Sequence, residues 1–433
     1  MGLAIDFSAS SLASSSSQEV GYLVGLRGLF VLQSFLWTFL QAFVPAVVEA
    51  PQDTIAPTYQ VILRKTVSVL FWNKSLIYSF FILVSARTIC IPFLWNPTKS
   101  TLASSVFRRG IRLWFPAAVA LAITTLIFSQ IGLTHLEDFK RGTGNEAIEV
   151  PYKIPKALTY FNSVFGLFWT TRNFATQAGN TAFPGQQLWI VNAIFQQSYT
   201  VYMAMVILPY TRPAWRLQSY AIIIVTAWWV QSWVWYSFTG LALADAVTNM
   251  AFREKAKRGI KIWRSIRCPV WVLYTVLTTA GLVMQYLWTA WRPAYHQKEL
   301  VAHTGLYNSA SLNEDYDPKQ PLARDDDYLL LLGLFLFIEH FEGLRYVLAN
   351  RLFIYLGRRS LSWLLVQSIF IYTAGVKLFM HLRFQKDWPL EGSAAVCLAV
   401  CVPATVLLAE VFYRAVEHPS QVLARVMFDW IRE

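Results

Sequence analysis

The sequence predicts an all-α polytopic membrane protein. Of its 433 residues, 55% are hydrophobic and only 14% are charged. Apolar runs of about 20 residues, the length that crosses a hydrocarbon core, recur along the whole chain. The basic residues lie mainly in the connections between these runs, as is typical of membrane topology. The formal net charge of +12 therefore indicates orientation in a bilayer, and nucleic acid is not expected as a partner.

The predicted elements follow one another within a single membrane domain, residues 21–420. The serine-rich segment 1–20 precedes it, has no signal-peptide pattern and is expected to be disordered. Residues 421–433 are expected to form a cytosolic tail. About ten spans are predicted, at residues 29–48, 76–93, 113–133, 187–210, 218–235, 236–250 (short), 270–290, 328–345, 360–380 and 392–413.

Charge in the connections predicts the orientation of these spans. Connection 251–268 has seven Lys or Arg residues against one Glu, and placing it in the cytosol puts both termini there. The two long polar connections, 134–186 and 291–327, then form lumenal loops. The acidic cluster Asp325–Asp327 in the second loop is interpreted as a solvated cap and not as a Mg²⁺ diphosphate site. No metal or other cofactor is expected.

Several segments, in order, resemble the acyltransferase-three family of ten-helix membrane proteins. Together they cover residues 25–419, and the ordered set is more specific than any one of its members. They read GLRGL, FFILVSA, SSVFRRGIRLWFP, QLWIVNAIFQQSYTVY, FTGLALAD, YLGRRSLSWLLVQ and FYRAVEHP.

The resemblance implies proton-handling residues that this chain lacks. The family carries a histidine ten or eleven residues after the arginine of its first helix, where this chain has Trp37 and Thr38. A family glutamate corresponds to Ile194, and a second histidine corresponds to Gln367. Acyl transfer to a hydroxyl needs a group that takes a proton near neutral pH. The scaffold is therefore expected to be retained while the chemistry has changed.

A narrower resemblance fits this pattern of losses. The opening GLRGLFVLQSFLWTFLQAFVPA is similar to fungal integral-membrane terpene cyclases of meroterpenoid biosynthesis, of the ascochlorin or macrophorin type. It implies a type II cyclase in the endoplasmic reticulum that acts on the farnesyl or epoxyfarnesyl chain of a prenylated small molecule. Such chemistry needs a carboxylic acid that stays protonated and aromatic faces that stabilise carbocations.

Carboxyl groups within apolar runs are costly and therefore functional candidates. Glu339 and Asp245 are the predicted catalytic acids. Glu339 and Glu342 are expected on one helix face because they lie three residues apart. Glu342 is expected to pair with Arg345 or Arg351, and Glu410 is expected to pair with Arg414.

Seven residues are predicted to bind the substrate because they match family positions or place amides and indoles in apolar runs. Each has a structural alternative: tryptophans in interfacial belts, amides in interhelical hydrogen bonds and arginines at lipid phosphates. The seven are Arg27, Trp37, Gln33, Asn192, Gln196, Gln367 and Trp233.

Three other functions remain open. The first is a membrane O-acyltransferase that uses acyl-CoA on a hydroxylated acceptor, with His340 or Glu339 as its base. The second is a transporter, although no inverted repeat is visible in the sequence. The third is an inactive relative that only binds a pathway partner. Expected partners are the prenylated substrate, membrane lipid and other pathway enzymes.

Overall fold

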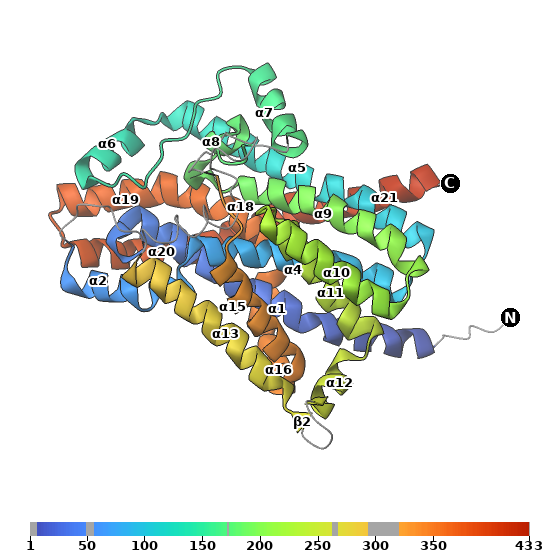
Figure 1. Ribbon diagram of the computed structural model, residues 1–433. Coiled ribbons are helices and arrows are strands. Elements are labelled where there is room, and N and C mark those ends of the chain that lie inside the picture. Colours follow the sequence, from blue (N-terminus) through green and yellow to red (C-terminus); the bar gives the residue numbers. More distant parts are fainter. Residues whose placement is uncertain (1–6, 49–55, 171–172, 262–266, 293–319, 433) are drawn as a thin grey trace, which may run out of the picture.

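The computed structural model describes residues 7–48, 56–170, 173–261, 267–292 and 320–432. Their regular structure is almost entirely helical (Figure 1), which confirms the predicted all-α class for these residues. The exception is a two-stranded antiparallel ribbon, β1 (Ile260–Lys261) and β2 (Arg267–Cys268), in the basic connection 251–268.

The helices have the following bounds. The first half of the chain contains α1 (Phe7–Phe43), α2 (Thr58–Lys65), α3 (Ser68–Phe71), α4 (Lys74–Trp95), α5 (Lys99–Ile131), α6 (Thr134–Thr143), α7 (Ala157–Trp169), α8 (Ala178–Thr181), α9 (Trp189–Ile207) and α10 (Pro213–Trp229). The second half contains α11 (Val234–Asn249), α12 (Phe252–Arg258), α13 (Val270–Tyr286), α15 (Asp325–His340), α16 (Glu342–Leu348), α17 (Arg351–Arg358), α18 (Ser360–Phe370), α19 (Val376–Met380), α20 (Leu390–Phe412) and α21 (His418–Arg432). Short 3-10 turns occur at Pro45–Val47, Pro184–Gln186 and Leu208–Tyr210, and π-helical turns at Leu287–Trp291, Ile371–Gly375, His381–Gln385 and Tyr413–Glu417.

Seven helical segments in the described part of the chain are long and apolar enough to cross a membrane. They are Val20–Phe43, Ser68–Trp95, Lys99–Ile131, Pro184–Tyr210, Val270–Trp291, Ser360–Gln385 and Leu390–Arg432. The other three predicted spans coincide with α10, α11 and α15, which have 17, 16 and 16 residues. A hydrocarbon core needs about 20. The membrane class is thus supported, and ten spans and cytosolic termini stay predictions.

Helix α4 occupies the centre of the bundle. It begins where the side chain of Asn73 accepts hydrogen bonds from the backbone N–H groups of Ser75 (3.0 Å) and Leu76 (3.5 Å), as an N-cap residue does. Within Ser68–Trp95, 83% of the most apolar window is buried inside the protein. Helices α1, α9, α11 and α15 pack against α4. Side chains on α4 can therefore contact several parts of the chain at once.

Helices α1 and α17 approach each other so closely that glycine is required at their crossing. A Cβ atom on Gly28 would overlap the carbonyl oxygen of Phe353, and one on Gly357 would overlap the carbonyl oxygen of Val24. Small residues allow this kind of backbone approach between membrane helices. The close contact fixes the start of the first span against the "YLGRRS" segment.

The connections and ends contain more helix than the sequence suggested. Helix α1 begins at Phe7. Residues 7–20, which were expected to be disordered, therefore extend the helix of the first span toward the N-terminus. Adding residues to an existing helix costs less free energy than nucleating a new one. The expected loop 134–186 contains α6, α7 and α8, and the expected tail 421–433 belongs to α21 as far as Arg432. Most of the other expected loop, residues 293–319, lies outside the described residues. The start of α1 and the end of α21 lie on the same side of the molecule in Figure 1.

The predicted span 328–345 is interrupted. Phe341 has an extended backbone (φ −95°, ψ 113°), ends α15 and caps α16. The side chain of Glu339 is consequently buried, whereas that of Glu342 is 71% exposed. The prediction that these two carboxyl groups share one helix face is wrong, because the helix ends between them.

Candidate functional site

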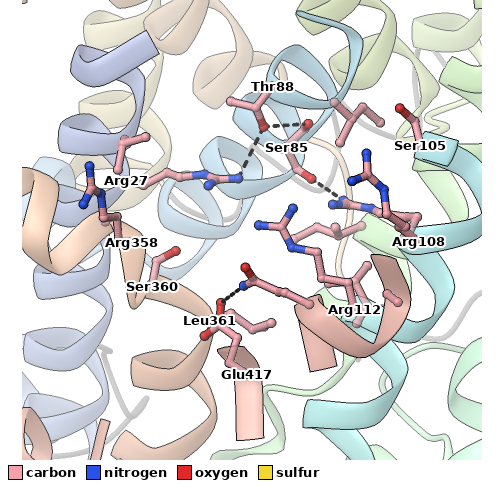
Figure 2. A pocket seen from close by; sticks show the side chains of 18 of the residues that line it. Arg27, Ser85, Thr88, Ser105, Arg108, Arg112, Arg358, Ser360, Leu361 and Glu417 are labelled. Atoms are coloured by element: carbon pink, nitrogen blue, oxygen red, sulfur yellow. Dashed lines mark hydrogen bonds between the residues drawn. The ribbon is translucent and has the colours of Figure 1, made fainter. Parts of the chain in front are cut away.

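A cationic cavity of about 420 Å³ lies between α1, α4, α5, α9, α17, α18 and α21, and we call it the arginine pocket (Figure 2). Its charged lining consists of six arginines and one glutamate. These are Arg27, Arg108, Arg109, Arg112, Arg358, Arg425 and Glu417. With so little compensating negative charge, the pocket is suited to an anionic ligand.

Neutral hydroxyl groups hold two of these arginines in place. The Nη2 group of Arg27 donates to Thr88 Oγ1 at 3.3 Å. Arg109 donates from Nε to Ser198 Oγ at 2.9 Å and from Nη2 to Ser85 Oγ at 2.5 Å. Figure 2 shows Arg27 reaching into the cavity. Of the seven predicted substrate-binding residues, only Arg27 lines this pocket.

The positions where the resemblance implied histidines meet in the interior. The Nε2 group of Gln367 lies 3.4 Å from Thr38 Oγ1, 3.0 Å from Ser34 Oγ and 3.0 Å from Gln187 Oε1. Gln187 Nε2 in turn donates to Thr38 Oγ1 at 2.7 Å. This cluster contains amides and hydroxyls, none of which accepts a proton near neutral pH. It is suited to orienting a polar group and not to removing a proton.

Trp37 and Trp233, both predicted substrate residues, belong to one buried series of aromatic rings. Neighbouring ring centroids are 6.0 Å apart for Trp37 and Tyr78, 5.2 Å for Tyr78 and Trp189, 6.1 Å for Trp189 and Trp233, and 5.5 Å for Trp233 and Tyr236. All five side chains are buried. We call these five residues the aromatic series. Their burial excludes the interfacial-belt alternative for the two tryptophans.

The three remaining predicted amides are separated from the arginine pocket. Asn192 Nδ2 donates to Gln177 Oε1 at 2.9 Å, and Gln196 Nε2 donates to the carbonyl oxygen of Phe168 at 2.6 Å. The buried Oε1 atom of Gln33 and the buried Oδ1 atom of Asn192 have no hydrogen-bond partner among the described residues. Interhelical hydrogen bonding accounts for Asn192 and Gln196, and the structure does not gather these amides into one site with Arg27.

Glu339 is held by cations. It accepts hydrogen bonds from Arg87, from the hydroxyl of Tyr22 and, at 3.0 Å, from Arg253 Nε. Its side chain and that of Arg87 are almost completely buried. Paired guanidinium groups favour the ionised form of a carboxyl. This arrangement does not suit Glu339 to the role of a protonated catalytic acid.

Asp245 is also paired with an arginine. Its side chain is fully buried and accepts from Arg216 Nη1 at 3.4 Å, from the hydroxyl of Tyr220 at 3.1 Å and from Asn249 Nδ2 at 2.6 Å. These contacts join α10 to α11. A packing role accounts for these contacts, and the paired Arg216 favours the ionised form of the carboxyl.

Two other acidic residues have the surface roles expected of them. Glu410 accepts from Arg414 Nε at 2.6 Å and also pairs with Arg359, which confirms the Arg414 prediction. Glu342 pairs with Arg345 at 3.7 Å, as expected, and with Lys257 Nζ at 3.1 Å.

The acidic cluster is buried, so its interpretation as a solvated cap is wrong. Residues 325–327 form the first turn of α15, and the side chains of Asp326 and Asp327 are fully buried. Asp326 makes a two-pronged ion pair with Arg324, with distances of 3.0 and 2.5 Å. Trp228 Nε1 donates to Asp325 at 2.9 Å. Carboxylates are favoured in the first turn because of the positive end of the helix dipole.

Asp327 differs from Glu339, Asp245 and Asp326 because none of its side-chain hydrogen-bond partners is charged, a property that it shares with the buried Glu417. Its Oδ2 atom accepts from Ser75 Oγ at 2.5 Å and from Ser79 Oγ at 3.4 Å, and its Oδ1 atom accepts from Gln285 Nε2. The sequence analysis missed this residue. The available signal was three acids directly before an apolar run, which is typical of a helix start.

Among the described residues, no three His, Cys, Asp or Glu side chains are grouped so as to hold a metal ion. Comparisons with protein-family models, with curated proteins and with solved structures give no match for this chain. A proposal for the function of this chain therefore rests on the geometry of its own residues.

Proposed function

We propose that this chain is a membrane-bound type II terpene cyclase that closes rings in the farnesyl or epoxyfarnesyl chain of a meroterpenoid precursor. The observation that carries the proposal is Asp327, a fully buried carboxyl group with neutral hydrogen-bond partners. Burial favours the protonated form of a carboxyl when no bound cation compensates its charge. Asp327 thus takes the role first assigned to Glu339 and Asp245, which are bound by arginines.

Aromatic rings beside this carboxyl support the same chemistry. Tyr236, the last member of the aromatic series, lies 5.4 Å from the ring of Tyr328, and the ring of Trp235 stacks on Tyr328 at 4.6 Å. Tyr328 follows Asp327 directly in the chain. Desolvated aromatic faces attract cations by about 2 kcal/mol each. Carbocations formed by protonation at Asp327 would meet these faces, with Trp233 and Trp37 further along the series.

The reaction conserves atoms. Asp327 delivers a proton to the terminal alkene or epoxide, the resulting cation is attacked by internal alkenes to form rings, and a base removes one proton at the end. The product is consequently an isomer of its substrate. The arginine-paired acids Glu339 and Asp245 support the bundle in this scheme, and no metal takes part in it.

The proposal includes a place in the cell. We place the protein in the endoplasmic reticulum membrane of a fungus with about ten spans and cytosolic termini, in a secondary-metabolite pathway whose other enzymes and lipids surround it. The seven long apolar helices are consistent with a membrane location, and the basic connection 251–268 supports the orientation.

The test is turnover by microsomes from a host that lacks such pathways. They are fed a farnesylated phenol, its terminal epoxide and, separately, acyl-CoA with hydroxylated acceptors, and products are identified by mass. A product isomeric with the prenylated substrate supports the cyclase. A gain of one acyl mass would instead support the membrane O-acyltransferase.

A matched pair of variants tests the acid. Asp327→Asn should lower the rate about 10²-fold or more, because a positioned proton donor contributes at least that much. Glu342→Gln, the same change of chemistry at a side chain that is 71% exposed, should keep full turnover. Wild-type rates for a correctly inserted Asp327→Asn protein would exclude Asp327 as the acid.

A further inference from the structure

The arginine pocket contains cations that the fold leaves unpaired. Within the described part of the chain, Arg112, Arg358 and Arg425 have neither a hydrogen bond nor an ion pair to another residue. They come from α5, α17 and α21, three elements that are distant in sequence. In Figure 2, the guanidinium group of Arg112 lies between those of Arg27 and Arg108. Like charges brought together in this way repel one another unless an anion joins them.

The single carboxylate of the pocket, Glu417, can balance at most one of these positive charges. Glu417 Oε2 accepts from the backbone N–H of Ser362 at 3.2 Å and from its hydroxyl at 2.5 Å, and Oε1 accepts from Gln421 Nε2 at 3.1 Å. These partners are all neutral, and they fix the carboxylate at the edge of α18. The remaining positive charge of the pocket is therefore free to bind a ligand.

The number and type of the cations indicate more than one phosphate group. A guanidinium group binds a phosphate through two parallel N–H donors, so that one phosphate is satisfied by about two arginines. Six arginines line this pocket. A carboxylate or a phenolate would neutralise only one of them. A diphosphate offers negative charge and acceptor oxygens to the three arginines that have no partner in the described part of the chain, Arg112, Arg358 and Arg425.

The rest of the lining indicates that the diphosphate is attached to an apolar group. Beside the arginines, the cavity is bounded by apolar side chains of α1, α4, α5 and α18. Among them are Val24, Phe81, Ile89, Leu113, Leu361 and Leu364. A cavity with a charged part and an apolar part matches an amphiphile.

We propose that the arginine pocket binds the diphosphate head group of an amphiphile. This inference depends on the pocket alone and does not require the cyclase proposal. Two sources share the chemistry of two phosphate groups on an apolar molecule: a diphosphate ester that enters from solution, such as a prenyl diphosphate or a coenzyme A thioester, and a bilayer lipid whose head group carries more than one phosphate.

The test uses the full-length protein in nanodiscs of phosphatidylcholine. Its thermal midpoint is followed by tryptophan fluorescence with added inorganic diphosphate and with sulfate at the same ionic strength. A ligand that binds only the folded state raises the midpoint. We expect diphosphate to raise it more than sulfate does. Equal shifts would overturn the proposal, because they would reflect general screening.

Variants locate the site. Arg112→Gln and Arg358→Gln should each weaken diphosphate binding about tenfold, the effect of losing one charge-assisted contact. Both side chains are exposed and unpaired, so folding should be unaffected. The matched control is Arg212→Gln, an exposed arginine that does not line the pocket, and it should bind like wild type. An equal loss in all three variants would also overturn the proposal.

Competition binding shows whether the ligand comes from solution or from the bilayer. Tighter binding of farnesyl diphosphate or coenzyme A thioesters than of inorganic diphosphate supports a soluble amphiphile. Displacement of diphosphate by phosphoinositide-containing nanodiscs supports a bilayer lipid. Failure of every amphiphile to bind more tightly than inorganic diphosphate would overturn the amphiphile part of the proposal. Cyclase turnover is measured separately, so either proposal can fail alone.

Discussion

Replacement of Glu339 by glutamine separates a structural role from a catalytic one. The side chain of Arg87 is 2% exposed, and its Nε and Nη1 atoms have no partner among the described residues. Glu339 is its only anionic partner there. Glu339→Gln therefore leaves a buried guanidinium group without a counter-charge. Breaking a buried pair in this way costs about 3–5 kcal/mol of folding free energy.

The assay is chemical unfolding of the purified protein in detergent micelles, followed by tryptophan fluorescence, with turnover measured on the same preparations. The expected loss corresponds to a change of about 10²-fold or more in the unfolding equilibrium. Glu342→Gln is the matched control and should unfold like wild type, since that carboxylate is exposed. A combined Arg87→Met and Glu339→Leu variant should recover much of the loss, because it leaves no fully buried charge unpaired and Arg253, the second cation at Glu339, is 25% exposed. A Glu339→Gln protein with wild-type unfolding and no turnover would refute this reasoning and restore Glu339 as the acid.

Three further predictions concern packing and polar contacts. Asp245→Asn should lower the unfolding free energy by about 1–3 kcal/mol through its weakened contact with Arg216 and keep turnover; loss of turnover at unchanged stability in the same assay would contradict this. Gln367→Leu should cost about 1–3 kcal/mol, because it removes the donor that Gln187 Oε1 accepts from, and an unchanged unfolding midpoint would argue against the interior polar cluster. Gly28→Ala should abolish the monodisperse peak in size-exclusion chromatography, whereas Gly110→Ala, whose added Cβ meets no atom within 4 Å, should elute like wild type.

The helices could be predicted from the sequence because apolar runs determine them locally. Each predicted span overlaps a helix, although span 328–345 is divided between α15 and α16. The pairing of Glu410 with Arg414, one helical turn apart, was equally local. The interruption at Phe341 was not predictable in this way. The buried ion pair between Glu339 and Arg87 on α4 holds the end of α15 against α4. That contact joins residues far apart in sequence.

The candidate site depended on such distant contacts throughout. Thr38 and Gln367 could be singled out as departures from a family pattern, but the sequence did not place them side by side. The three consecutive acidic residues Asp325–Asp327 predicted exposure to solvent. In the structure, Ser75 on α4 and Gln285 on α13 donate hydrogen bonds that make burial of Asp327 possible. The unpaired state of Arg112 and Arg358 likewise follows from which carboxylates the fold brings near them.

The close crossing of α1 and α17 has a consequence for biosynthesis. Val24 and Gly28 on the first span contact Gly357 and Phe353, which a ribosome makes some 330 residues later. At about 5–20 residues per second, this interval lasts tens of seconds. During that time, the glycine face of the first helix has no α17 to pack against. A chaperone that shields nascent membrane helices is therefore expected to set the yield of this protein, and hosts with less of that chaperone should degrade more of it.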